Sequence, residues 1–278
     1  MASQIDLHCH TTASDGALAP VALVDRAVER GLQTLAITDH DTMAGYLQVR
    51  DYAAQKGLRL IPGIELSCQW RGINIHIVGL NCDPEHPVMN AAVEAQGQVR
   101  YQRAKTIADR LAKKLNTEIN FADIEKLAGG EIGRPHFAQY LVDRGLVADK
   151  AQAFKKYLGA GKVGDVKSGW PEIDTAVRWI VESGGQAVMA HPHHYRMTRT
   201  KLMDCLALFK DAGGQGMEVC CGLMDNNTMG NMRRIANEME LMGSCGSDFH
   251  GPNKFGLDLG VMPKFPEKDI QPIWSAFL

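Results

Sequence analysis

The sequence lacks the features that mark several broad classes of protein. No stretch approaches the roughly 18 consecutive apolar residues that a membrane-spanning helix needs. The first residues show neither the basic nor the apolar part of a secretory signal. A formal net charge of −2 gives no general attraction to nucleic acid or to an anionic membrane. Hydrophobic residues at 45% and charged residues at 22% exclude a disordered or fibrous chain. The length of 278 residues suits one α/β barrel-sized domain with an insertion.

Two kinds of covalent chemistry also lack support. Seven cysteines, an odd number without regular spacing, indicate reduced thiols in the cytoplasm rather than a disulfide framework. The sequence has no glycine-rich phosphate-binding loop and no Gly-x-Ser-x-Gly segment for a serine nucleophile. What the composition does provide is histidine, with ten residues.

Strand and helix patterns alternate in the two outer parts of the chain. Strand patterns occupy 5–8, 34–38, 58–67, 73–80, 187–190, 216–220 and 243–247, and helical patterns occupy 20–30, 43–55, 173–182, 202–212 and 227–239. Helices between short buried strands predict a mainly parallel sheet or barrel.

The middle of the chain shows only helical patterns, over 87–115, 121–129, 135–144 and 149–158. An all-helical block inside an alternating chain predicts an inserted cap domain over 87–162, with the barrel formed by 1–86 and 163–278. Residues 96–162 hold 13 basic against 7 acidic residues, so the cap is expected to be basic and the barrel acidic.

The histidines gather where strands are expected to end. Six of them share this position with three carboxylates, and the set is His8, His10, Asp15, His40, Glu65, His76, His191, Asp248 and His250. Because the carboxyl ends of parallel strands form one face of a sheet or barrel, these residues are expected to converge there.

Divalent metal ions explain such a set best. Three carboxylates brought together without a cation would repel one another, and buried charge needs a partner. A lone strand histidine such as His76 is more often a core residue, and Asp248-Phe249-His250 alone would suit a turn. The joint pattern favours a shared site for two or three ions, with Mn²⁺ expected first and Zn²⁺, Fe²⁺ or Mg²⁺ as alternatives.

Several segments resemble the motifs of a known family. They are Asp6-Leu-His-Cys-His-Thr-Thr-Ala-Ser-Asp-Gly16, Ile37-Thr-Asp-His-Asp41, Pro62-Gly-Ile-Glu-Leu-Ser67, His76-Ile-Val-Gly-Leu-Asn81, Ala190-His-Pro192 and Gly246-Ser-Asp-Phe-His250. They resemble the PHP (polymerase and histidinol phosphatase) family. Gly133-Arg-Pro-His-Phe-Ala138 and Phe154-Lys-Lys-Tyr-Leu158 are similar to its bacterial subfamily of 3′,5′-nucleoside bisphosphate phosphatases and 5′-to-3′ exoribonucleases of the RNase AM type.

The resemblance implies a distorted (β/α)7 barrel with an inserted all-helical cap and a di- or trinuclear metal centre. By the resemblance, His8, His10, Glu65 and Asp248 would surround one ion. Glu65 would bridge to a second ion held by His76 and His191, and Asp15, His40 and His250 would hold a third. The implied activity is hydrolysis of the 3′-phosphate of nucleoside 3′,5′-bisphosphates, together with removal of nucleotides from RNA 5′ ends.

Charge arithmetic supports a phosphoryl substrate. Three divalent ions, three carboxylates and a bridging hydroxide leave a charge of about +2, which suits a phosphomonoester dianion. We expect metal-bound hydroxide to attack phosphorus in line, so no protein nucleophile is required.

Three residues are candidates for substrate contact. Arg134 is expected to clamp a phosphate, because guanidinium matches phosphate oxygens bidentately; the alternative is a helix-start arginine paired with a carboxylate. His194 is a candidate to serve the leaving group, and a solvated loop histidine is equally compatible with its position. His136 either faces the same pocket or has a structural role at the helix start.

Other charged residues flank these positions. Asp39 and Asp41 are expected to orient or cap, and Asp6 to fix an imidazole tautomer from behind a ligand. Arg100, Arg103, Arg110 and Lys114 fall on one predicted helical face. That face is either solvated or a basic track for a second phosphate or an RNA backbone.

Two other enzyme classes and one non-catalytic function remain as alternatives. A histidinol phosphatase would use the same chemistry. A C–N amidohydrolase would usually have a carboxylated lysine or fewer ligands, and no suitable strand-end lysine is present. A degenerate, non-catalytic site would lack ligands. We expect a small phosphorylated nucleotide as the partner, with short RNA 5′ ends as a further one, and neither a membrane nor an obligate protein partner.

Overall fold

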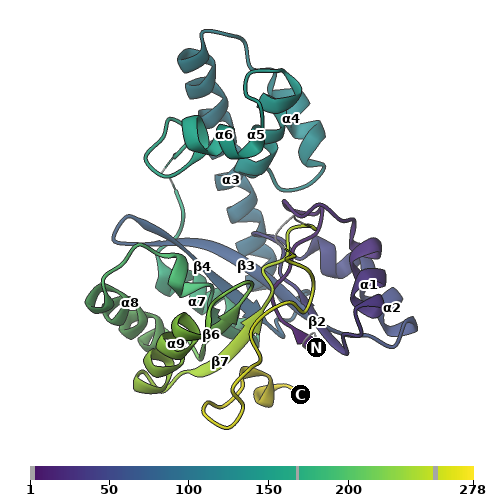
Figure 1. Ribbon diagram of the computed structural model, residues 1–278, viewed down its shortest axis with the longest axis vertical. Helices are drawn as coiled ribbons and strands as arrows, with labels where there is room; N and C mark the ends of the chain where they lie inside the picture. The colour runs from purple at the N-terminus through teal and green to yellow at the C-terminus, as the bar shows by residue number, and fades with distance from the viewer. Residues whose placement is uncertain (1–3, 167–168, 253–255) are drawn as a thin grey trace.

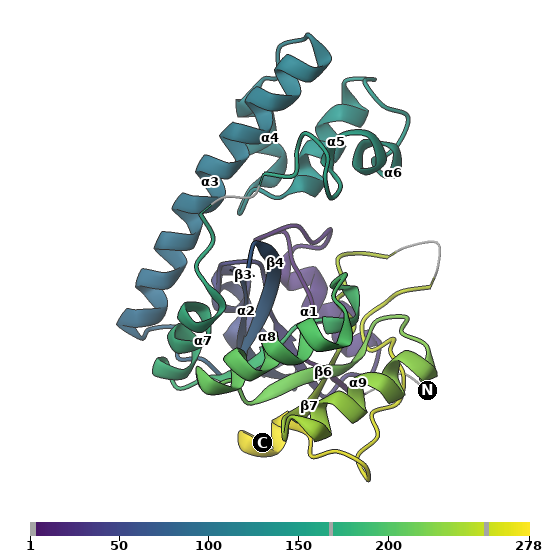
Figure 2. The same ribbon diagram turned by 90° about the vertical axis from the view of Figure 1, so that its left-hand side faces the viewer.

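The computed structural model describes residues 4–166, 169–252 and 256–278. Residues 1–3 of the expected barrel segment 1–86, and residues 167–168 and 253–255 of the segment 163–278, lie outside the described residues. The fold has two parts, a barrel surrounded by helices and a lobe of helices beyond one end of the barrel (Figures 1 and 2).

Seven strands lie side by side in the order in which they occur along the chain. They are β1 (Ile5–Asp6), β2 (Thr34–Ile37), β3 (Arg59–Trp70), β4 (Ile73–Leu80), β5 (Gln186–Met189), β6 (Gly216–Cys221) and β7 (Met242–Gly246). Strand β4 is antiparallel to both of its neighbours, and the other neighbouring pairs are parallel. The prediction of a mainly parallel α/β fold is confirmed.

The antiparallel pair has a local cause. Strands β3 and β4 are joined by Arg71 and Gly72, whose φ angles are 48° and 75°. Two consecutive residues with positive φ form the tight turn that matches the twist of an antiparallel hairpin. The chain therefore returns beside β3 directly, without the helix that would bring it back in the parallel direction.

The sheet closes by contacts between its first and last strands. The amide of Leu7 donates to the carbonyl of Cys245 at 3.1 Å, and the amide of Asp248 donates to the carbonyl of His8 at 2.8 Å. Cys9 and Phe249 form a further parallel bridge. A side chain at Gly246 would overlap His8, so glycine is needed where these strands meet. Closure places the residues that follow β1 and β7 at one mouth of the barrel.

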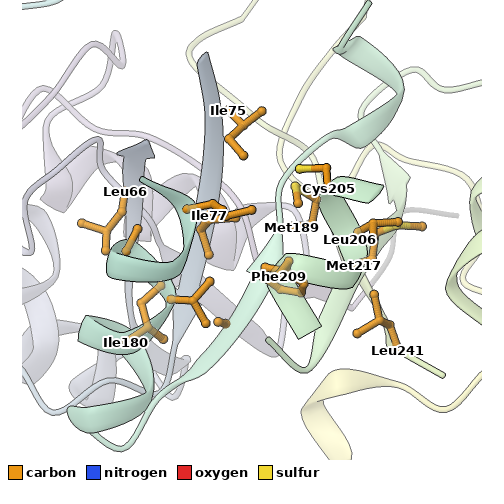
Figure 3. Close-up of a cluster of buried hydrophobic side chains, with 14 of the residues drawn as sticks. Leu66, Ile75, Ile77, Ile180, Met189, Cys205, Leu206, Phe209, Met217 and Leu241 are labelled. Atoms are coloured by element: carbon orange, nitrogen blue, oxygen red, sulfur yellow. The ribbon is translucent and has the colours of Figure 1, made fainter. Parts of the chain in front are cut away.

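Helices cover the outside of the barrel. They are α1 (Pro20–Glu29), α2 (Ala44–Gln55), α7 (Ile173–Glu182), α8 (Arg199–Asp211) and α9 (Asn226–Glu238), with short 3₁₀ segments η2 (Pro192–His194) and η3 (Ile273–Ala276). Leu66, Ile77, Ile180, Phe209 and Met217 belong to a buried cluster between strands and helices (Figure 3). Burial of this apolar layer, at about 25 cal/mol per Å² removed from water, fixes the strands against the helices.

The helical lobe has its own apolar core. It comprises α3 (Pro87–Leu115), α4 (Phe121–Ala128), α5 (Arg134–Asp143), α6 (Lys150–Ala153) and a π-helical turn η1 (Phe154–Leu158). Helix α3 starts beside the barrel and extends into the lobe, where the other helices pack on its distal half (Figure 2). Ile107, Leu111, Phe137 and Leu141 are fully buried in this second cluster. The single helix expected over 149–158 is instead a short α-helix followed by the π turn.

Candidate metal centre

The nine residues expected to bind metal ions lie together at one mouth of the barrel. His8, His10 and Asp15 follow β1, His40 follows β2, and His191 follows β5. Asp248 and His250 follow β7, while Glu65 and His76 belong to the β3–β4 hairpin. Two of these residues, His191 and Asp248, have φ angles of 27° and 52°, in the region that non-glycine residues rarely adopt. Such backbone strain concentrates at functional sites, where the surrounding structure imposes it.

Glu65 lies at the centre of the cluster and is buried. One carboxylate oxygen lies 2.9 Å from Nε2 of His191 and 3.0 Å from Nδ1 of His76. The other lies 2.8 Å from Nδ1 of His40 and 3.4 Å from Nε2 of His10. One carboxylate therefore faces four imidazoles, one on β4 and three in the segments that follow β1, β2 and β5, which suits a bridging ligand.

The ligand atoms form four overlapping groups, each within 4.8 Å. The groups are His10, Asp15, His40 and His250; His8, Glu65 and His191; His8, His10 and Asp248; and His40, Glu65 and His76. The geometry differs from the implied partition in several respects, since His191 groups with His8 and Glu65, and His10 also joins Asp15, His40 and His250. His76 groups with His40 and Glu65, whereas the resemblance places it with His191 on one ion.

The hydrogen bonding of these residues fits metal ions. Eight buried nitrogen and oxygen atoms on seven of the nine residues find no hydrogen-bond partner among the described residues; they are Nε2 of His8, both ring nitrogens of His10, Oδ1 of Asp15, Nδ1 of His40, Oε2 of Glu65, Nδ1 of His76 and Nδ1 of His191. Buried polar atoms normally have partners, because an unsatisfied one costs about 1–3 kcal/mol. Nitrogen and carboxylate donors around a shared space are the ligands that first-row divalent ions prefer.

Burial and neighbouring charges shift the pKa values of residues in the cluster. Burial and the nearby His250 lower the pKa of His10 to about 3, so its imidazole stays neutral and keeps a lone pair for a metal ion. Burial alone would raise the pKa of Glu65, but the surrounding imidazoles, led by His40 and His76, hold it well below its ordinary value. Glu65 is therefore ionised at neutral pH.

A tenth residue, Glu218 on β6, supports the cluster and was missed by sequence reasoning. Its carboxylate accepts a hydrogen bond from Nδ1 of His8 at 2.8 Å and one from the backbone amide of His191 at 2.5 Å. These contacts orient one ligand ring and the backbone of another. The available signal is a single acidic residue inside the otherwise apolar strand Gly216–Cys221, all of which is buried.

Asp6 does not have the role expected for it. Its carboxylate accepts backbone amides of Ser247 and Gly260, both at 2.8 Å, and of His8 at 3.3 Å. It therefore joins the β1 and β7 segments rather than an imidazole, because Glu218 occupies the position behind His8.

Glu218→Gln is expected to lower metal affinity 10- to 100-fold, the usual effect of removing a carboxylate behind a ligating histidine. The amide keeps a similar volume but offers only one acceptor oxygen to His8 and His191. Titration of the metal-free protein with Mn²⁺ measures the change. Glu238→Gln, on the exposed face of α9, serves as the control and should leave the affinity unchanged. Equal affinities for both variants would contradict a positioning role.

Asp39 and Asp41 both orient neighbouring groups, as expected. Asp39 accepts the backbone amide and hydroxyl of Thr11 and the hydroxyl of Ser14, each at 2.7 Å, which shapes the loop between His10 and Asp15. Asp41 accepts the amide of Ser67 at 2.7 Å and forms a buried ion pair with Arg100 of α3.

The four basic residues on α3 do not form one solvated face. Arg100 and Arg103 are buried, and their guanidinium groups lie 5.3 Å and 5.9 Å from the ring centre of Trp170. Arg110 and Lys114, further along the helix, are exposed. On this face of α3, the part nearer the barrel is therefore buried at the barrel mouth, and the part further along the helix faces solvent.

Between the cluster and the lobe lies a cavity of about 170 Å³, here named the cap-side cavity. Asp15, His40, His76, Arg103, Arg134 and Phe154 are among its lining residues. Arg134 donates to the carbonyl of Leu158 at 3.1 Å and lies 4.0 Å from Asp165. Burial and the proximity of Arg134 lower the pKa of Arg103 to about 10. Arg134 is thus paired with Asp165, whereas no carboxylate of the described residues lies within 4.0 Å of Arg103. Two guanidinium groups that line one cavity favour an anion there.

The two candidate histidines have different surroundings. Nδ1 of His136 accepts the amide of Gly133 at 2.9 Å, so this residue closes the first turn of α5. His194 stacks on His191 with ring centres 5.4 Å apart. Burial, and then His191, lower its pKa below the ordinary value, so it is neutral at pH 7. His136 thus has the structural role, and His194 lies beside the ligand cluster.

A seven-stranded barrel with an imidazole–carboxylate cluster at one mouth defines a metallohydrolase class of protein. A model described as the PHP domain matches residues 6–162, more than half of the chain. The chain belongs to the PHP family.

Two curated relatives match nearly the whole chain. A 5′-3′ exoribonuclease from Haemophilus influenzae is 43% identical over 279 residues, covering 100% of both chains. A 3′,5′-nucleoside bisphosphate phosphatase from Chromobacterium violaceum is 38% identical and covers 98% of this chain and 95% of its own.

Two solved structures share the fold. A protein described as an amidohydrolase from Chromobacterium violaceum, with bound sulfate and no metal, has a TM-score of 0.91 at 38% identity and covers 99% of this chain and 95% of its own. A protein described as a metal-dependent phosphoesterase from Bifidobacterium adolescentis has a TM-score of 0.84 at 26% identity, with the same coverage. The prediction of a PHP-type barrel and of a hydrolase is confirmed.

Proposed function

We propose that this protein is a metal-dependent phosphoesterase that hydrolyses the 3′-phosphate of nucleoside 3′,5′-bisphosphates and removes nucleotides from RNA 5′ ends. The observation that carries the proposal is the placement of Arg103 and Arg134 across the cap-side cavity from the ligand cluster. A substrate with two phosphate groups can place one at the metal centre and the other between the arginines. The names of the two curated relatives describe these two activities.

Two or three divalent ions are proposed to bind the nine residues, with Mn²⁺ first and Zn²⁺, Fe²⁺ or Mg²⁺ as alternatives. Bound there, they would supply Lewis acidity that lowers the pKa of a water molecule and polarises the phosphoryl oxygens. Glu65, Asp15 and Asp248 compensate their charge, and Glu218 fixes the orientation of His8.

Residues outside the ligand cluster are proposed to bind the substrate and to donate a proton to the leaving group. Arg134 and Arg103 are proposed to hold the 5′-phosphate, and Phe154, which lines the same cavity, to contact the base or sugar. His194 is proposed to donate a proton to the leaving O3′, because it lies against His191 at the barrel mouth. Because its pKa is lowered, His194 carries little positive charge at pH 7. Its role as a proton donor therefore requires a nearby carboxylate or phosphate that raises this pKa.

The helical segment 87–162 is proposed to act as a cap domain. It supplies Arg100, Arg103, Arg134 and Phe154 to the space above the metal centre and has a separate apolar core. No helix among the described residues is long and apolar enough to cross a membrane. All seven cysteines are free and buried, which supports the cytoplasm as the place of action.

The alternatives have less support. A histidinol phosphatase would not need a second anion site, which Arg103 and Arg134 provide. One structural neighbour is described as an amidohydrolase. However, no lysine of the described residues lines the cap-side cavity beside the ligand cluster.

The proposal is tested by phosphate release from adenosine 3′,5′-bisphosphate in the presence of Mn²⁺. We expect a kcat/KM at least tenfold above that for histidinol phosphate, no cleavage of an N-acetyl amino acid, and loss of activity with a chelator. The same preparation should shorten a 5′-phosphorylated oligoribonucleotide. The absence of release, or release that His10→Ala does not change, would overturn the proposal.

A further inference from the structure

The metal centre opens on two sides that differ in size and chemistry. The cap-side cavity meets it at Asp15, His40 and His76. A second cavity, of about 420 Å³, meets it at Asp248 and His194. This second cavity shares His193 and Thr228 with a third one of about 600 Å³. The two cavities are adjacent at these shared residues, and they are here named together the α8–α9 groove.

The cap-side cavity is small and holds the two arginines. At about 170 Å³ it is smaller than the roughly 300–1,000 Å³ of typical small-molecule pockets. Arg103, Arg134 and Trp170 line its side toward the helical lobe. The proposed function places the 5′-phosphate of the terminal nucleotide at the two arginines and its 3′-phosphate at the metal centre, so the rest of an RNA chain leads away from the metal centre on the other side.

The α8–α9 groove is lined by apolar side chains and by rings. Its interior is apolar, with Met197, Leu202, Met232 and Ile235. Leu223 at the other end is 57% exposed, the largest exposure among the large apolar residues in the described part of the chain. The rings of His193 and Tyr195 line the groove as well, and bases stack on such rings without sequence preference.

Charged groups of the groove leave one arginine available for a phosphate. Arg199 forms an ion pair with Glu238. Asp225 accepts hydrogen bonds from the hydroxyl and amide of Thr228 and from the amide of Asn227. Arg234 contacts only the side chain of Asn231 and the carbonyl of Gly230, with no ion pair among the described residues.

We propose that the α8–α9 groove binds the second and third nucleotides of an RNA 5′ end, with Arg234 on a backbone phosphate. This inference rests on the proposed function. Both substrates lose the same bond: water oxygen bonds to phosphorus, the P–O3′ bond breaks, and O3′ takes a proton. A bisphosphate then gives a 5′-nucleotide and free phosphate. An RNA gives a 5′-nucleotide and a chain that keeps the phosphate at its new 5′ end, still in the groove.

The groove therefore separates the two activities. A nucleoside bisphosphate occupies only the cap-side cavity and the metal centre, so it never reaches Arg234. An oligonucleotide reaches it from the second or third residue onward, so kcat/KM should rise with chain length from two to four residues.

Arg234→Ala tests the proposal, with Arg233→Ala as the matched control. Arg233 is adjacent on α9 but is paired with Asp269 and does not line the groove. We expect Arg234→Ala to lower kcat/KM for a 5′-phosphorylated pentaribonucleotide about tenfold and to remove the dependence on length. Hydrolysis of adenosine 3′,5′-bisphosphate should stay within twofold. Arg233→Ala should leave both activities within twofold.

Binding without turnover keeps the two proposals distinguishable. The affinity of a labelled pentaribonucleotide is measured in a chelator at several salt concentrations. Arg234→Ala should weaken binding and lower the slope of log affinity against log salt by about 0.7, the value for one phosphate of a single strand. Unchanged affinity and slope would overturn the groove assignment. Binding that depends on Arg234 in a protein without phosphatase activity would support the groove and contradict the proposed function.

Discussion

Replacing Glu65 by alanine is expected to lower kcat/KM for adenosine 3′,5′-bisphosphate by about a thousandfold or more. Removal of a supporting carboxylate typically costs 10–100-fold in metal affinity or activity, and Glu65 itself belongs to two of the four ligand groups. Its loss leaves His40, His76 and His191 facing one another without the anion that they share. Metal content should fall together with activity, as measured by elemental analysis.

Glu29→Ala, at an exposed position on α1, provides the control and should keep both metal content and activity. Circular dichroism of Glu65→Ala establishes that the barrel remains folded. Full metal content and activity in the folded variant would contradict the assignment of Glu65 as a shared ligand.

The convergence of distant residues could be predicted because it follows from topology. Parallel strands end at one face, and this places His8 beside Asp248 although they are 240 positions apart in the sequence. The two hairpin residues reach the cluster for a different reason. Glu65 and His76 come from antiparallel strands, and the turn at Arg71 and Gly72 brings them together. No helix was predicted between these two strands, and the described hairpin has none.

Supporting residues were harder to predict than ligands. Glu218 has no motif around it, and its partner His8 lies 210 positions away, so its role becomes visible only when β6 lies beside β7 and β1 closes the barrel. Arg100 and Arg103 line the cavity beside the metal centre, which favours the predicted basic track over the solvated face, whereas Arg110 and Lys114 of the same face are exposed. Periodicity gives the face of a helix, whereas the surface against which that face packs depends on where α3 leaves the barrel.

The ion pair between Arg100 and Asp41 is expected to give the largest effect on stability. Arg100→Met keeps most of the side-chain volume but leaves Asp41 buried without its cation. Breaking one partner of a buried pair typically costs about 3–5 kcal/mol in the free energy of unfolding. Urea unfolding at a fixed Mn²⁺ concentration measures it, because metal binding itself shifts apparent stability. For a chain of this size the loss corresponds to a decrease in Tm of roughly 6–20 °C.

Arg110→Met, on the exposed part of the same helix, should change stability by no more than about 0.5 kcal/mol. The variant Asp41→Asn tests the pair from the other side. Asparagine tolerates the φ of 57° at this position and still accepts the amide of Ser67. The double variant should then cost less than the two single variants together, with a coupling of about 2 kcal/mol. Additive effects would show that α3 is held to the barrel by packing against Trp170 and by Gln96, which donates to Asp41 at 2.8 Å, rather than by the charge pair.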